Sequence, residues 1–217
     1  MVNIDSECQA KYLERVSDRW MSASNRVMVF IDGSNIFWGL KNYRNTREKT
    51  FFIDYSKLVS LVAGPRQVRG SHYYASQPAI PSEGQVKFMD ALRQSGISVI
   101  SKTLKMRRDS SGGTPRAVEK GVDVALVTDL LSFAWEEAYD DAVLVSGDAD
   151  YTEAVKKVKG KGRMVDVVAW RESLSRELKL VASKVVYIDD IIDKIRLVES
   201  TTSPSATSPA SKAVVRP

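Results

Sequence analysis

Short runs of consecutive apolar residues recur along the chain, and segments with helical spacing separate them. The clearest runs are Val27–Ile31, Ala142–Val145 and Met164–Ala169. A continuous apolar run of this length is typical of a strand that is buried on both faces of a parallel sheet. Strands that alternate with helices predict an α/β fold with a mainly parallel central sheet and helices on both of its faces.

The other elements expected from the pattern are shorter or less regular. Further strands are predicted over 68–75, 97–100 and 185–188, with an extended segment over 103–107. Helices are predicted to begin near Ser34 and Asp54 and to span 82–94, 122–138, 150–159, 173–182 and 189–198, the last of them capped by Asp189.

The composition changes at both ends of the chain, which predicts three parts. Residues 1–25 are expected to contain a helix, because Tyr12, Val16 and Trp20 recur at four-residue spacing. This helix could pack on the domain or on a second copy, so a homodimer is one expectation. Residues 26–198 form the predicted domain. Residues 199–217 are rich in Ser, Thr and Pro and are predicted to be a disordered tail, because they offer little surface to bury.

Aspartates follow two of the predicted strands. Asp32 comes directly after the first apolar run, and Asp148 and Asp150 come shortly after Ala142–Val145. Asp123 stands where the long helix over 122–138 should begin. Ligands of open parallel sheets bind beyond the carboxyl ends of the strands, where the strand order reverses. If the first and fourth strands are neighbours, the carboxylates of Asp32, Asp123 and Asp148 meet at one end of the sheet.

Such a cluster of carboxylates is unfavourable unless a cation neutralises it. Oxygen ligands suit Mg²⁺ or Mn²⁺, which can activate a water and stabilise charge on a phosphodiester. Asp150 is expected either to bind the ion directly or to support its ligands. Each aspartate alone could instead be an ordinary helix N-cap, so the prediction rests on their occurrence together.

Three segments carry a resemblance to a known family: Phe30-Ile-Asp-Gly-Ser-Asn35, Lys120-Gly-Val-Asp-Val124 and Leu144-Val-Ser-Gly-Asp-Ala-Asp-Tyr151. In order and separation they resemble the signature segments of NYN domains of the LabA-like family, within the PIN-like nuclease superfamily. The resemblance covers about residues 26–190. It implies a three-layer Rossmann-like fold, a Mg²⁺ or Mn²⁺ site and activity on RNA.

By position, the resemblance carries specific roles onto this chain. Asp32, Asp123 and Asp148 match the acidic metal ligands of the family, and Asp150 matches its further acidic position. Ser34 and Asn35 match the polar residues beside the first aspartate.

Basic residues gather between 102 and 120, around a Ser-Gly-rich stretch. A mobile basic loop beside an acidic site could hold the phosphates of RNA. Solvated surface charge is the alternative explanation. The candidate substrate-binding residues are Ser34, Asn35, Arg107, Arg108, Lys120 and Ser146. Trp38 and the tyrosines at 43, 73 and 74 could stack on bases or simply belong to the core.

The overall charge permits nucleic-acid binding without establishing it. The net charge is +5. The single cysteine, Cys8, cannot form an internal disulfide and suits a reducing compartment. The sequence shows neither an apolar signal-peptide core nor a run long enough to span a bilayer, so a cytoplasmic protein without membrane contact is expected. His72, the only histidine, is expected to be a strand residue.

Two functions remain open on the sequence. The first is a metal-dependent ribonuclease, in particular an endoribonuclease. The second is a non-catalytic RNA-binding or regulatory module on the same fold. A phosphatase is disfavoured because Ser34 stands where an aspartyl-phosphate enzyme needs an aspartate two residues after Asp32. A Toprim-like site is disfavoured because no glutamate follows the first strand.

Overall fold

The computed structural model describes residues 24–47, 51–107, 116–118 and 121–197. The helix predicted within 1–25 and the tail predicted over 199–217 lie outside the described residues, so both stay predictions. Among the described residues no helix is long and apolar enough to cross a membrane.

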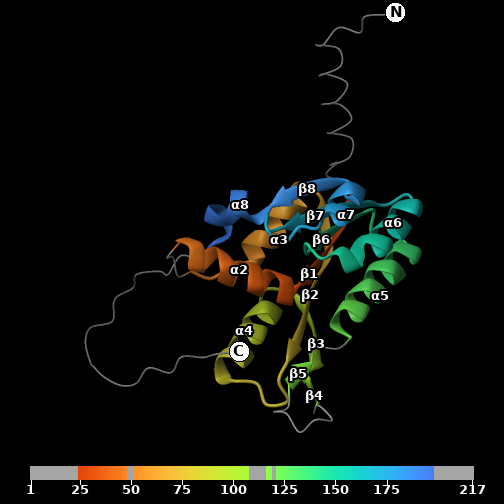
Figure 1. Ribbon diagram of the computed structural model, residues 1–217. Coiled ribbons are helices and arrows are strands. Elements are labelled where there is room, and N and C mark those ends of the chain that lie inside the picture. The colour runs from red at the N-terminus through yellow and green to blue at the C-terminus, as the bar shows by residue number, and fades with distance from the viewer. Residues whose placement is uncertain (1–23, 48–50, 108–115, 119–120, 198–217) are drawn as a thin grey trace, which may run out of the picture.

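The described chain alternates strands and helices, as the sequence pattern predicts (Figure 1). The strands are β1 (Arg26–Asp32), β2 (Gln67–Gln77), β3 (Ser98–Thr103), β4 (Lys105–Arg107), β5 (Arg116–Val118), β6 (Asp141–Val145), β7 (Met164–Ala169) and β8 (Lys184–Tyr187). The helices are α2 (Gly33–Arg47), α3 (Tyr55–Ala63), α4 (Glu83–Gln94), α5 (Val122–Trp135), α6 (Thr152–Gly160), α7 (Arg176–Val181) and α8 (Ile188–Ile195), with a 3₁₀ turn, η1 (Ala149–Tyr151), before α6.

Six strands form one parallel sheet in the order β3-β2-β1-β6-β7-β8. The chain builds outward from β1 to β3, and then returns to the other side of β1 to build β6, β7 and β8. The strand order therefore reverses between β1 and β6. The first and fourth strands of the sheet are therefore neighbours, which meets the condition stated for the aspartates, and this is the point where α/β sheets place their ligands.

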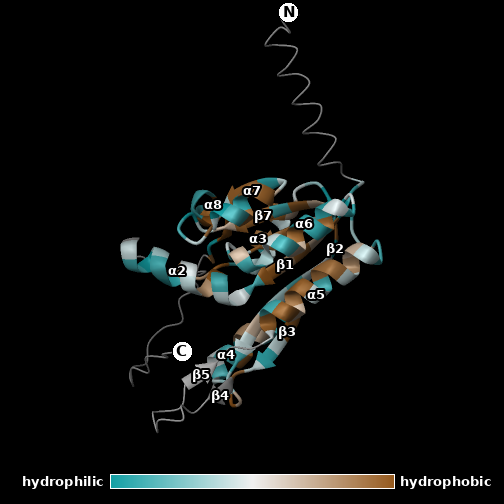
Figure 2. Cartoon of the chain, turned by 45° about the vertical axis from the view of Figure 1, so that its right-hand side comes forward, coloured by the Kyte–Doolittle hydropathy of each residue, from teal (hydrophilic) through white to brown (hydrophobic). Residues whose placement is uncertain are grey.

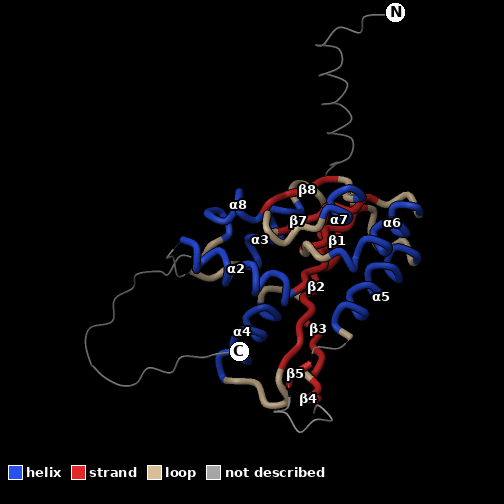
Figure 3. Tube along the Cα trace, in the orientation of Figure 1, coloured by secondary structure: helices blue, strands red, loops and turns tan. Residues whose placement is uncertain are grey.

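Helices cover both faces of the sheet, which gives the three layers seen in Figure 3. One core lies under α2, α3, α4 and α8 and takes Val27, Val29 and Ile31 from β1. The other lies under α5, α6 and α7 and takes Met28 and Phe30. Successive side chains of a strand point to opposite faces, so one apolar run supplies both cores. The mainly parallel α/β class is confirmed, and Figure 2 shows the apolar residues concentrated on the strands and on α5.

Three helices differ from their predicted ends. Helix α5 stops at Trp135 instead of 138 because Glu137 adopts a positive φ of 56° and turns the chain back toward the sheet. Helix α7 starts only at Arg176, because Ser175 caps it by accepting a hydrogen bond from the Leu178 amide. Helix α8 begins at Ile188, so Asp189 lies in its first turn and is not its cap.

A buried ion cluster lies at the amino end of the sheet, away from the reversal of strand order. Arg66 donates from one guanidinium nitrogen to Asp141 at 3.1 Å and to Asp166 at 3.0 Å. Its other nitrogens donate to the carbonyls of Val62 and Ala63. Asp141 opens β6, so it belongs to the sheet end opposite Asp148. This cluster ties α3 to β6 and β7.

Candidate active site at the carboxyl ends of the strands

Asp32 is the last residue of β1 and is only 4% exposed. The Ser146 hydroxyl, just after β6, donates to its Oδ2 at 2.9 Å, and the Tyr151 hydroxyl donates to the same oxygen at 3.2 Å. The amide of Asn35 donates to Oδ1 at 3.1 Å. The hydrogen bond from Asn35 is the N-cap interaction expected if Asp32 is an ordinary helix cap. The hydroxyls of Ser146 and Tyr151 also hold the second carboxylate oxygen, from the end of β6 and from η1.

Tyr151 joins Asp32 to Asp123. Its hydroxyl lies 3.1 Å from Asp123 Oδ1 and 3.2 Å from Asp32 Oδ2, so one hydroxyl stands between two carboxylates. Burial raises the pKa of Asp32, and the nearby charge of Asp123 raises it further, although the hydrogen bonds act in the opposite direction. Burial and the two carboxylates also keep the pKa of the Tyr151 hydroxyl far above neutral pH, so it stays a donor.

Asp148 and Asp150 occupy different positions, although they are two residues apart. Asp148 caps η1 by accepting a hydrogen bond from the Asp150 amide at 3.0 Å, and its exposed side chain lines the same cavity as Asp32 and Asp123. Asp150 is exposed and is absent from that lining. Asp129, six residues after Asp123, accepts a hydrogen bond from Tyr74 and is likewise outside the lining.

Asn35 connects three chain segments at the site. Its Oδ1 accepts a hydrogen bond from the Gly147 amide at 3.2 Å and one from the Ser173 hydroxyl at 3.3 Å. The Ser175 amide in turn donates to the Gly147 carbonyl at 2.9 Å. The ends of β1, β6 and β7 are therefore held together by one amide side chain.

Glycine is needed at positions 33 and 147 because neighbouring groups pack closely there. Neither has a positive φ. A Cβ on Gly147 would lie 2.4 Å from the Ser173 carbonyl oxygen, and one on Gly33 would lie 2.5 Å from the Tyr73 ring. Glycine at both positions permits close packing instead of an unusual backbone conformation.

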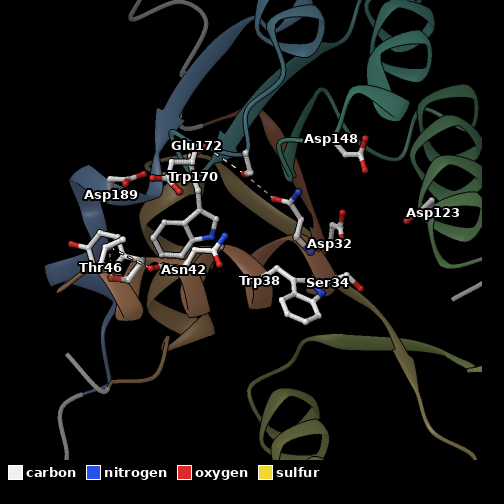
Figure 4. Close-up of a pocket in the computed structure, with 14 residues that line it drawn as sticks. Asp32, Ser34, Trp38, Asn42, Thr46, Asp123, Asp148, Trp170, Glu172 and Asp189 are labelled. Carbon is white, nitrogen blue, oxygen red and sulfur yellow. Dashed lines mark hydrogen bonds between the residues drawn. The ribbon is translucent and has the colours of Figure 1, made fainter. Parts of the chain in front are cut away.

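A cavity of about 580 Å³ opens beside these residues (Figure 4). At one end it is lined by Asp32, Asp123 and Asp148, with Ser34 and Asn35 at the start of α2. Its other lining residues are Trp38, Gly39, Asn42, Tyr43, Thr46, Trp170, Glu172, Ser173 and Asp189. The cavity therefore begins at the reversal of strand order and extends along α2.

The donor set suits a hard divalent cation only in part. Among the described residues, no three His, Cys, Asp or Glu side chains are close enough together to hold a metal ion. The pair Asp32 and Asp123 does converge, and Mg²⁺ in proteins often uses only one or two carboxylates while it keeps several waters. The raised pKa of Asp32 also means that a cation beside it would relieve an unfavourable buried charge.

The predicted substrate-binding residues fall into three groups. Ser34 and Asn35 line the cavity. Ser146 is fully buried behind Asp32, so its hydroxyl orients that carboxylate and does not face a substrate. Arg107 ends β4, which forms an antiparallel hairpin with β5 beyond the end of β3, whereas Arg108 and Lys120 lie outside the described residues.

Tyr151 and Trp170 were not predicted from the sequence as residues of the site. Tyr151 follows Asp150 in the motif itself, but only the fold shows that its hydroxyl lies between Asp32 and Asp123. Trp170 is the first residue after β7. The rule that directs attention to the residues after each strand applies to β7 as well and would have found it.

The architecture and the site define the class: an α/β domain of Rossmann-like strand order with an acidic site at the reversal of strand order. The NYN domain family matches residues 26–189, and the chain belongs to this family. NYN domains are PIN-like nucleases, which generally use divalent metals. The family indicated by the three sequence motifs is thereby confirmed.

Two similar proteins extend the comparison. The low amplitude and bright protein LabA of Synechococcus elongatus is 28% identical over 189 residues, which are 86% of this chain and 97% of LabA. A crystal structure of a protein of unknown function from Vibrio parahaemolyticus shares the fold with a TM-score of 0.62 at 23% identity, and covers 81% of this chain and 98% of its own.

Proposed function

We propose that this protein is a metal-dependent ribonuclease, in particular an endoribonuclease, that hydrolyses RNA phosphodiesters at the acidic end of the cavity. The observation that supports this most is the buried Asp32, held by three donors and facing Asp123 across the Tyr151 hydroxyl. A structural carboxylate needs one cap hydrogen bond. A carboxylate oriented through both oxygens at a cavity end is typical of a ligand whose position matters.

Asp32 and Asp123 would hold a Mg²⁺ or Mn²⁺ ion, and Asp148 would complete the ligand set from the cavity rim. Such an ion activates water and stabilises negative charge on the phosphate in the transition state. Ser146 and Tyr151 would fix the orientation of Asp32. Asn35 would hold Gly147 and Asp148 in a fixed position relative to Asp32. Asp150, at the rim but outside the lining, would tune the charge of the site.

RNA would approach along the cavity, with its phosphates near Ser34. The basic residues Arg107, Arg108 and Lys120 are proposed to attract the strand from the side of the β4–β5 hairpin. Phosphate contacts of this kind supply affinity without sequence preference and weaken with salt.

The decisive test is cleavage of a labelled single-stranded RNA with Mg²⁺ or Mn²⁺, with EDTA as the metal-free condition. Asp32→Asn, Asp123→Asn and Asp148→Asn are each expected to lower the rate at least 100-fold. Asp129→Asn is the matched control for Asp123→Asn, because it makes the same change on the same helix outside the cavity lining. It should cleave at close to the wild-type rate. Cleavage that survives EDTA, or that all the variants share, would defeat the proposal.

One observation favours the alternative, a non-catalytic RNA-binding or regulatory module. No described trio of carboxylates stands at metal-ligand distance. A module of this kind would bind RNA equally well with and without divalent metal, and its affinity would survive the three Asp→Asn changes. Binding measured in EDTA alongside the cleavage assay separates the two functions.

A further inference from the structure

The cavity is much longer than a metal site needs. From Asp32 it continues along α2 past Trp38 and Asn42 to Thr46, with Trp170 beside it (Figure 4). Ser34 and Trp38 are one helical turn apart, a rise of about 6 Å. A volume of about 580 Å³ lies in the range that proteins use for small ligands. The acidic end occupies only part of this space, so the α2 part has room for a ligand group of its own.

Trp38 forms one wall of this α2 part, and 52% of it is exposed. The Lys41 ammonium lies 4.6 Å from the centre of its ring, and the edge of Phe37 contacts it at 5.4 Å between ring centres. A half-exposed indole on a cavity wall with a cation beside it is the arrangement that proteins use to stack the bases of single-stranded nucleic acids.

Trp170 also lines the α2 part of the cavity and packs closely on α2. It is only 3% exposed, and its indole N–H has no hydrogen-bond partner among the described residues. Gly39 lets it come this close to α2, because a Cβ there would lie 1.9 Å from the indole ring. Tyr43 packs on it at 5.3 Å between ring centres. The indole nitrogen is itself buried, and a Cβ on Gly39 would lie 2.2 Å from it, so Trp170 contributes its ring to the cavity and not its N–H.

The charges of the lining identify which part of a nucleotide fits. Among the described residues that line the cavity there is no Lys or Arg, whereas Glu172 and Asp189 contribute carboxylates at the α2 part. Carboxylates repel phosphate but accept hydrogen bonds from the N–H groups of bases. The amide of Asn42, also in the lining, can donate to and accept from a base edge. The α2 part therefore favours a base over the sugar-phosphate backbone.

We infer that the α2 part of the cavity binds one unpaired nucleobase of the RNA strand, stacked on Trp38 and contacted by Asn42, next to the phosphate at the aspartates. This inference rests on the proposed function, because it takes RNA as the substrate. It adds that the enzyme needs a base at a fixed position beside the cleaved bond, and so requires single-stranded RNA there.

The test is an abasic scan of binding in EDTA, measured by fluorescence anisotropy with single-stranded RNAs that each lack one base. With the wild-type protein, one position is expected to weaken binding about tenfold when its base is removed. Trp38→Ala should weaken binding to intact RNA by a similar factor, and the abasic change at that position should then have no further effect. Trp38→Phe keeps a ring and should retain most of the affinity.

Trp135→Ala is the matched control. Trp135 is 51% exposed and has Lys161 over its ring at 5.3 Å, but it ends α5 outside the cavity lining. It should leave the abasic profile unchanged. If removing a base has the same effect on binding at every position, or if Trp38→Ala and Trp135→Ala lose equal affinity, the inference is wrong. Cleavage with a flat profile defeats only the base site, whereas a position-dependent profile without cleavage in Mg²⁺ or Mn²⁺ defeats only the nuclease.

Discussion

The hydroxyl of Tyr151 lies 3.1 Å from a carboxylate oxygen of Asp123, and the same hydroxyl reaches Asp32 at 3.2 Å. A hydroxyl has one proton, so it can donate to only one carboxylate at a time. The two acids are thus kept near each other by a neutral group that cannot cancel their charges. The hydroxyl therefore leaves in place the negative charge that the proposed cation would neutralise.

Replacing this hydroxyl should affect catalysis more than folding. Tyr151→Phe keeps the buried ring and removes the donor to Asp32 and Asp123. Groups that orient metal ligands typically contribute about 10- to 100-fold to metal affinity or activity, so we expect a loss of cleavage in that range. The measurement is the cleavage rate as a function of Mn²⁺ concentration.

Tyr139→Phe is the matched control for that variant. Tyr139 is also fully buried, and its hydroxyl donates to the Leu130 carbonyl at 2.6 Å, away from the cavity lining. This change should lower the free energy of unfolding by about 1 kcal/mol and leave the metal dependence of cleavage unaltered. Equal metal profiles for the two variants would show that Tyr151 is only a core residue.

A methyl group at position 147 should distort the site. In Gly147→Ala the new Cβ would meet the Ser173 carbonyl oxygen at 2.4 Å, and backbone must move because neither group is flexible. We expect the hydrogen bond from the Gly147 amide to Asn35 to break, cleavage to fall at least tenfold and stability to fall by about 1–3 kcal/mol. Cleavage assays and urea unfolding measure the two effects.

Gly84→Ala gives the opposite outcome and serves as the comparison. Gly84 is in the first turn of α4, and a Cβ there would meet nothing within 4 Å. Alanine should stabilise the protein by about 0.4–1 kcal/mol, because it restricts the unfolded chain. If both alanine variants are stabilised, the packing assigned to Gly147 is wrong.

The buried ion cluster predicts a large effect far from the site. Arg66→Met would leave the carboxylates of Asp141 and Asp166 buried without a cation. We expect a loss of about 3–5 kcal/mol in the free energy of unfolding, measured in urea. Arg93→Met removes an exposed ion pair with Asp90 and should change stability by no more than about 0.5 kcal/mol. A small loss in Arg66→Met would mean that water reaches the cluster.

Acid should remove the contribution of Asp140 to stability. Hydrogen bonds from the Arg26 guanidinium, together with the charge of Arg163, lower the pKa of Asp140 to about 2. A lowered pKa in the folded protein gives stability that is complete above the unfolded pKa of about 4 and is lost as the pH falls through about 2. Because the pair is partly exposed, we expect a contribution of only about 1 kcal/mol.

This expectation is checked by urea unfolding of the wild type and Asp140→Asn at several pH values. The variant should be less stable at pH 6, and the difference should shrink between about pH 4 and pH 2. A constant difference across that range would assign the effect of the substitution to packing and not to charge.

The sequence predicted the parts of this protein that depend on local pattern. The apolar runs around Val29 and Val143 identified strands buried on both faces, because each run supplies both cores. The aspartates at 32, 123 and 148 were predicted to share one sheet end, and they line one cavity. Asp32 and Asp148 follow strands, Asp123 begins a helix, and parallel strands end at the same edge of the sheet.

Features that depend on contacts between distant residues were not predictable in this way. The hydroxyls of Tyr151 and Ser146 form hydrogen bonds with Asp32, although both residues follow it by more than 110 positions in the sequence. The spacing of apolar and polar residues in the sequence does not indicate the direction in which these side chains point. Glycine is likewise needed at position 147 because Ser173 packs against it. Ser173 reaches that place only through the folded connection between β7 and α7.

The pairing of β1 with β6 also bears on how the protein is made. Ser146 and Tyr151 follow Asp32 by 114 and 119 residues, so a ribosome delivers Asp32 well before the residues that orient it. Strands β1, β2 and β3 are neighbours and can associate without the second half of the sheet. The growing chain therefore carries an unfinished site while it is still held at the ribosome, and the acidic centre assembles only after β6 and η1 have been synthesised.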